Sequence, residues 1–180
     1  MHITPAKARG VGLFEVLVSL LVIALLAALT APGLSRMVDR NRHQAHLSML
    51  YADLQQARAM ALSSGHVVRL RLFSHPGGSC YVLHHGAAGS CTCDGEGQTQ
   101  CMSDAALIKS HWLPQSTRLR LAGSVTQLAF HPKYGTVSRA GTLSIHGPAG
   151  SRADHVVAIT GRVRSCATAA AQLRLPVCAG

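Results

Sequence analysis

The strongest constraint on this chain is an apolar stretch close to its N-terminus, RGVGLFEVLVSLLVIALLAALTAPG at residues 9–33. Over residues 16–31 only Ser19 and Thr30 are polar. About 20 helical residues span the roughly 30 Å hydrocarbon core of a bilayer, so this stretch can just cross a membrane as a helix. Two basic side chains in residues 1–10 favour a cytoplasmic location for that end of the helix.

One carboxylate, Glu15, lies inside this stretch. An acidic group in a membrane-spanning helix costs about 2.5–3.5 kcal/mol on insertion scales, so such a group usually has a cationic partner or a function. A secretory signal peptide is cut after its apolar region and has no carboxylate there. Here the plausible cut lies before the apolar region, between Gly10 and Val11. We therefore expect the helix to remain on the mature chain; the alternative is an uncleaved signal anchor in which Glu15 is incidental.

The order of Gly10, an apolar residue, Glu15 and an Ala31-Pro32 pair resembles the prepilin signature of type IV pilins and type II secretion pseudopilins. The resemblance implies that a prepilin peptidase cuts after Gly10 and methylates the new amine on Val11. It also implies that Glu15, the fifth mature residue, pairs with the N-terminal ammonium of a neighbouring subunit in a filament. Two unit charges about 4 Å apart attract by about 4 kcal/mol at an effective dielectric constant of about 20, which offsets the burial cost.

We expect three segments: a leader at 1–10, the membrane and filament-core half of a helix at 11–38, and a globular domain at 39–180. Beyond Pro32, where a kink or local break is expected, apolar residues recur at helical spacing. The helix should stop at Ser63-Ser64-Gly65, because glycine readily adopts the left-handed cap conformation. The apolar positions of the second helical half are Met37, Leu47, Leu50, Leu54, Ala57, Ala61 and Leu62.

After the helix the apolar pattern changes to a period of two, which is typical of strands with one buried face. At least five short strands are expected, separated by Gly, Pro and Ser turns. They lie within residues 66–73, 117–123, 127–132, 142–147 and 155–166. The fold class is α+β, an antiparallel sheet packed against a long N-terminal helix. The resemblance implies that this is the pilin fold.

The segments YADLQQARAMALSSGHVVRLRL, LAFHPKYGTVSRAGTLSIHG and HVVAITGRVRSC resemble, in order and spacing, the GspH/FimT group of minor pilins and pseudopilins. The similarity covers most of the mature chain, except the Cys-rich segment 80–112. It implies a minor subunit of a type IV pilus-like filament, at or near the tip. Its implied location is the bacterial inner membrane, crossed once, with the C-terminal domain in the periplasm.

The Gly-Arg-x-Arg sequence at residues 161–164 suggests a binding function. Alternate residues of a strand share a face, so Arg162 and Arg164 should point the same way about 7 Å apart, close to the phosphate spacing of a nucleic-acid strand. Each guanidinium can hold phosphate oxygens bidentately, and Arg174 could extend the patch. The resemblance to FimT-like proteins implies DNA binding during natural transformation. The alternatives are that these arginines merely solvate the strand, or that the chain is a secretion pseudopilin without DNA affinity.

The chain is basic, with 17 Lys and Arg against 7 Asp and Glu, which favours an anionic partner. Only 4% of its residues are aromatic, which argues against the base stacking that single-strand binders use. Carboxylates are too few for paired-acid catalysis, and none of the 11 histidines lies in a catalytic motif. We therefore expect no enzyme activity and no cofactor. The expected partners are other pilin subunits, the prepilin peptidase, DNA and the inner membrane.

Six cysteines in an exported chain indicate disulfides. We expect Cys166 to pair with Cys178, which would fix the C-terminal tail beside the arginines. The other four, which allow three connectivities, should pair within their own Gly-rich loop region; they are Cys80, Cys91, Cys93 and Cys101. The alternative for this region is a zinc site that adds His84 or His85 as a ligand.

Overall fold

The structure, a computed structural model, describes residues 12–168 and 173–178, with residues 29–32 as backbone only. The expected leader at 1–10 and the cut between Gly10 and Val11 lie outside the described residues. The chain forms two compact units that divide between Asp39 and Arg40.

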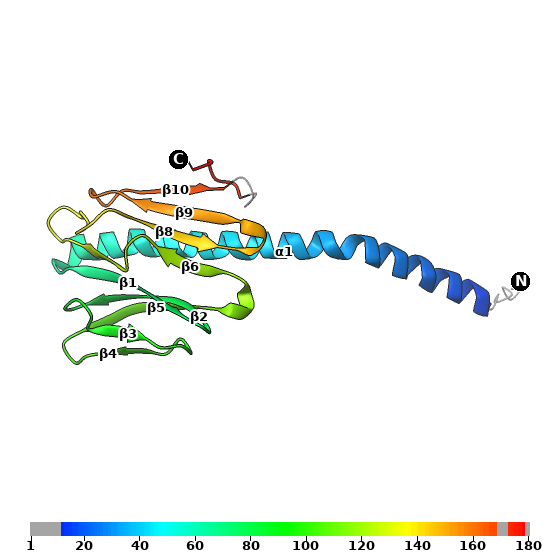
Figure 1. Cartoon of the computed structure of the whole chain (residues 1–180), viewed down its shortest axis with the longest axis horizontal. Coiled ribbons are helices and arrows are strands. Elements are labelled where there is room, and N and C mark those ends of the chain that lie inside the picture. The colour runs from blue at the N-terminus through cyan, green and yellow to red at the C-terminus, as the bar shows by residue number, and fades with distance from the viewer. Residues whose placement is uncertain (1–11, 169–172, 179–180) are drawn as a thin grey trace, which may run out of the picture. The chain divides into compact units, whose positions relative to one another are not determined.

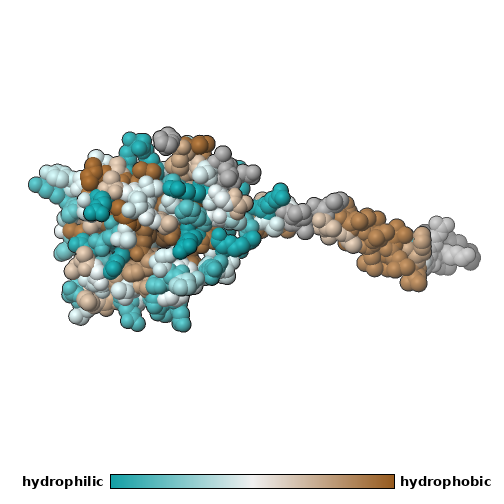
Figure 2. Space-filling view, in the orientation of Figure 1, coloured by the Kyte–Doolittle hydropathy of each residue, from teal (hydrophilic) through white to brown (hydrophobic). Residues whose placement is uncertain are grey.

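The first unit is the N-terminal half of helix α1 (Leu13–Ser64), whose apolar side chains are exposed and form the brown surface in Figure 2. By length and composition α1 could cross a membrane. Glu15 lies in its first turn, where the free N–H groups of a helix favour negative charge. A kink or a local break was expected at Pro32, and the break is absent, because α1 continues through this residue. Proline removes a single N–H donor, and the hydrogen bonds of the flanking turns keep the helix together.

The second half of α1 belongs to the globular unit and ends where the sequence predicted. Ser64 is its last residue, and Gly65 follows with a φ of 71°. Five of the expected apolar positions are buried: Leu47, Leu50, Leu54, Ala57 and Ala61. The other two apolar positions, Met37 and Leu62, are exposed.

Ten strands are present within the described residues, and all strand pairs are antiparallel. Two short 3₁₀ helices, η1 (Gln115–Thr117) and η2 (Pro148–Gly150), interrupt them. The strands are β1 (Val68–His75), β2 (Gly78–His85), β3 (Cys91–Cys93), β4 (Thr99–Cys101), β5 (Ala106–Pro114), β6 (Arg120–Gly123), β7 (Gln127–Phe130), β8 (Gly141–His146), β9 (Arg152–Val157) and β10 (Val163–Ala167).

These strands form two sheets where the sequence indicated one. The first sheet has the order β5-β2-β1-β7, the second has the order β10-β9-β8-β6, and β3 and β4 form a separate ribbon. The two sheets meet at β6, where the Leu121 N–H donates to Ser79 Oγ at 2.9 Å. Figure 1 shows strands of both sheets running alongside the C-terminal half of α1. The expected α+β class, a long N-terminal helix packed on antiparallel strands, is therefore confirmed, with more strands than expected.

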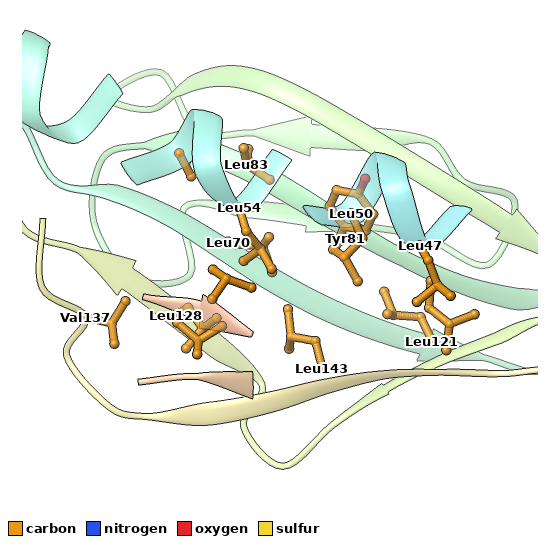
Figure 3. Close-up of a cluster of buried hydrophobic side chains, with 14 of the residues drawn as sticks. Leu47, Leu50, Leu54, Leu70, Tyr81, Leu83, Leu121, Leu128, Val137 and Leu143 are labelled. Atoms are coloured by element: carbon orange, nitrogen blue, oxygen red, sulfur yellow. The ribbon is translucent and has the colours of Figure 1, made fainter. Parts of the chain in front are cut away.

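A single core joins the helix to both sheets. The buried side chains of α1 pack against Leu70, Tyr81 and Leu83 of the first sheet and against Leu121 and Leu143 of the second (Figure 3). These side chains are almost completely buried. Burial of a leucine of this size stabilises the fold by about 1.5–3 kcal/mol, so this apolar face holds α1 on the domain.

Polar contacts fix the position of α1 within this core. The buried Asp53 carboxylate accepts hydrogen bonds from the Tyr81 hydroxyl and from Lys109 Nζ, the latter at 2.7 Å. Burial, together with the neighbouring carboxylate, raises the pKa of Tyr81 and keeps its hydroxyl protonated. His155 Nε2 donates a hydrogen bond to the Leu47 carbonyl at 3.0 Å. Nδ1 of the neutral ring therefore accepts a hydrogen bond from the Ser165 hydroxyl. These contacts connect α1 to β2, β5 and β9.

Candidate nucleic-acid interface

The sequence motif with the two arginines begins in a tight turn between two strands. We expected one strand over residues 155–166, but β9 and β10 pair with each other, Val157 opposite Val163. Between them the Ala158 N–H donates to the Arg162 carbonyl at 2.9 Å, and the Gly161 N–H donates to the Ala158 carbonyl at 2.8 Å. Gly161 has a φ of 77°, a conformation that suits glycine, and it reverses the chain.

This turn packs against the loop that follows β7. A Cβ atom on Gly161 would overlap the carbonyl oxygen of Gly135, so glycine is required for this approach. The same carbonyl accepts a hydrogen bond from Arg58 Nε at 3.2 Å. Nearby, the Val137 N–H donates to the Ile159 carbonyl at 2.9 Å. Two segments that carried the family resemblance, LAFHPKYG and GRVR, therefore touch each other at the end of the domain where α1 ends.

Arg162 and Arg164 are both exposed, while Val163 between them is buried. This is the alternation that we expected, although Arg162 lies one residue before β10 rather than in a strand. Within the described part of the chain neither guanidinium has a carboxylate partner. Both are therefore available to an anion from outside the domain.

The surrounding charge is positive. From residue 105 to residue 180 the single carboxylate side chain is Asp154, which accepts a hydrogen bond from Arg152 Nε at 2.8 Å. Burial alone would raise the pKa of Asp154, but hydrogen bonds from Arg152 and Ser144 outweigh it and lower the pKa. Asp154 is thus ionised and neutralises Arg152, which leaves Arg162 and Arg164 uncompensated.

Arg174 lies on the C-terminal tail, which runs parallel to the free edge of β10. The Ala167 N–H donates to the Pro176 carbonyl at 2.9 Å, and Val177 bridges to Ala167. Cys166 and Cys178 form a disulfide, the pairing that we expected for the tail. Because tail and strand run in the same direction, exposed Arg174 lies on the part of the tail that extends toward Arg164.

The remaining cysteines form two crossed bridges, Cys80–Cys93 and Cys91–Cys101. Pairing within this region was expected, but the region is not a simple loop. Cys80 lies on β2, and the ribbon of β3 and β4 packs its own cysteines against Val82 and Trp112. Since all four sulfurs are bonded, they offer no thiolate, and the zinc alternative with His84 or His85 is wrong.

Three residues of the loop after β7, which packs against the turn at Gly161, were missed by the sequence reasoning: Lys133, Tyr134 and Arg139. All are exposed, and Lys133 Nζ lies 5.3 Å from the centroid of the Tyr134 ring. The sequence offered one signal, because KYG follows a His-Pro pair in a turn and an aromatic residue is rarely placed there to fill a core. Arg139 lies two residues before Gly141, which pairs with Val157 at this end of β9.

Comparison with known proteins places these features in a family context. The family model described as type II transport protein GspH matches residues 47–161. Two crystal structures of the type IV minor pilin FimU of Pseudomonas aeruginosa, strain PAO1, are similar at 18% identity. The match to the first structure has a TM-score of 0.55 and covers 75% of this chain and 98% of FimU. The match to the second has a TM-score of 0.51 and covers 71% of this chain and 98% of FimU. No curated protein sequence matches the chain. The family match ends at Gly161, directly before the two arginines.

Proposed function

Since this chain belongs to the GspH family and has the fold of a type IV minor pilin, we propose that it is a minor filament subunit that binds DNA. In this proposal it lies at or near the tip of a pilus and binds the DNA phosphate backbone during uptake in natural transformation. Binding is independent of base sequence, because guanidinium contacts to phosphate do not read base edges.

The observation that supports DNA binding best is the pair Arg162 and Arg164. Both guanidiniums are exposed on either side of buried Val163, and neither is neutralised within the described residues. Arg152 and Arg58, by contrast, are each paired within the domain, Arg152 with a carboxylate and Arg58 with a backbone carbonyl. Arg174 adds a third cation along the tail. Three cations correspond to about three neutralised phosphates.

Assembly depends on the N-terminal half of α1. In this proposal the prepilin peptidase removes residues 1–10, and the new amine on Val11 pairs with Glu15 of an adjacent subunit. Before assembly, the precursor is anchored in the inner membrane by α1, which crosses it once. Glu15 at the start of α1 lies where such a pair can form without burying the carboxylate in the middle of the bilayer.

The test of DNA binding uses the full chain in detergent micelles and a fluorescent duplex. We expect the logarithm of the affinity to fall against the logarithm of the salt concentration with a slope of about −2.7. Arg162→Gln/Arg164→Gln should reduce the slope by about two-thirds and weaken binding strongly. The matched control is Arg40→Gln/Arg42→Gln. It removes the same charge from exposed positions at the start of the globular unit, whereas Arg162 and Arg164 lie near the end of α1. Equal affinity of the two double variants would refute the proposal.

The second candidate is a type II secretion pseudopilin that acts in protein export without binding DNA. The description of the matching family as a type II transport protein favours it. Gene deletion separates the two: loss of DNA uptake with secretion intact supports the first, and loss of secretion with DNA uptake intact supports the second.

A further inference from the structure

The contact between Gly135 and Gly161 lies beside three apolar side chains that the fold leaves exposed. Tyr134 is 66% exposed, Ile159 54% and Leu62 47%. They come from three segments: the loop after β7, the β9–β10 turn and the last turn of α1. Single exposed apolar residues are common on protein surfaces, but here the three segments that carry them meet. Gly161 packs on the Gly135 carbonyl, and a Cβ on Gly135 would lie 3.3 Å from Leu62 Cδ1.

The same place is basic. Lys133 and Arg139 are exposed in the loop after β7, Arg162 is exposed in the β9–β10 turn, and Arg164 follows on β10. We call these residues, with Leu62, Tyr134 and Ile159, the end surface. In Figure 1 the loop after β7 and the β9–β10 turn are both found at the left, where α1 also ends.

Tyr134 is held in this exposed position by the backbone of its own loop. The His131 N–H donates to the Thr136 carbonyl at 2.8 Å, and the Gly135 N–H donates to the His131 carbonyl at 2.9 Å. Phe130 pairs with Val137 across the base of the loop. A ring presented by a fixed loop loses little conformational entropy when a ligand stacks on it, which favours binding.

A duplex uses only part of such a surface, because its bases are stacked inside and it presents phosphates to the arginines. A single strand presents both phosphates and the flat faces of unpaired bases, and aromatic side chains bind those faces without regard to sequence. We propose that the end surface binds single-stranded DNA, with a base stacked on Tyr134 and the adjoining phosphates on Arg162 and Arg164. This inference rests on the proposed function and names the form of DNA that the site prefers. A single exposed ring is enough to stack one base, despite the low aromatic content of the chain.

The experiment compares two probes at about 150 mM salt: an oligothymidine of about 20 nucleotides and a hairpin duplex of similar length. The full chain in detergent micelles should bind the single strand more tightly. Tyr134→Ala should weaken single-strand binding about 5- to 150-fold, the value of one stacked base, and change duplex binding less than about 2-fold. Tyr134→Phe keeps the ring and should bind as the wild type does. Tyr51→Ala removes another exposed tyrosine, on α1, and should change neither affinity.

The two proposals fail in different ways. If neither probe binds, the proposed function fails. If both probes bind through the arginines but Tyr134→Ala affects both equally or neither, this inference alone fails. Binding to anionic vesicles that depends on Tyr134, without single-strand binding, would also overturn it and assign the end surface to a membrane. Circular dichroism of each variant excludes loss of fold as the cause.

Discussion

The lack of a side chain at Gly161 allows the two segments of the candidate interface to pack together. Gly161 reverses the chain with a positive φ, and its Cα lies against the Gly135 carbonyl, where a Cβ would have no room. The glycine of the Gly-Arg-x-Arg sequence therefore has a packing role that differs from the role of the arginines beside it. It sets where Arg162 and Tyr134 lie, because each adjoins one of the two touching glycines.

Gly161→Ala tests this packing role. We expect the free energy of unfolding to fall by about 2 kcal/mol more than for Gly150→Ala, since both residues have a positive φ but a Cβ on Gly150 meets nothing within 4 Å. Denaturant titration of the full chain in detergent, followed by circular dichroism, gives both values. Equal losses would mean that the contact with Gly135 adds no constraint beyond the strained φ.

At the scale of elements, the sequence predicted those features that depend on local chemistry. Gly65 ended the helix as expected, and the alternation in VVRLRLF produced β1. The prediction failed where the outcome depends on distant partners. Residues 155–166 read as one strand, because both halves alternate in the same way and Gly161 alone signals the reversal. Strand β2 was missed because it is buried on both faces, by the core on one side and by the disulfide ribbon on the other.

The C-terminal tail is an element held by two backbone hydrogen bonds and one disulfide. Removing the bridge in Cys166→Ala/Cys178→Ala should cost about 3 kcal/mol in the loop-closure model and should release the tail from β10. Trypsin, which cuts after arginine, should then cleave at exposed Arg174 much faster than in the wild type, as intact-mass spectrometry would show. Adding Arg174→Gln should abolish that cleavage. A cleavage rate equal to that of the wild type would show that the hydrogen bonds suffice without the disulfide.

At the scale of the whole domain, histidines connect α1 to both sheets. His43 Nε2 donates to the Ile145 carbonyl at 3.0 Å, and His46 Nδ1 lies 3.1 Å from His111 Nε2 on β5. Together with the hydrogen bond from His155 to the Leu47 carbonyl, these contacts join the helix to β5, β8 and β9. Burial, the largest cause, lowers the pKa of all four histidines. Arg42 lowers the pKa of His46 further, and His46 and Lys109 lower that of His111. The native fold therefore favours neutral rings.

This arrangement predicts that acid loosens the domain. In the unfolded chain these histidines take up protons near their ordinary pKa of 6.5, whereas the native rings remain neutral to lower pH. The unfolded state binds more protons in that interval, so the free energy of unfolding should fall as the pH decreases through 6.5. Each histidine adds at most about 1.4 kcal/mol per pH unit. Urea titrations at about pH 7.5, 6.5 and 5.5 measure the slope.

Variants separate the buried histidines from the other titrating groups. His155→Gln should unfold more easily at neutral pH but lose less stability on acidification, because one proton-linked group is gone. The lowered pKa of Asp154 affects stability only below its ordinary value of 3.8, outside this interval. A free energy of unfolding that stays constant or rises from pH 7.5 to 5.5 would contradict neutral histidines as the links between α1 and the sheets.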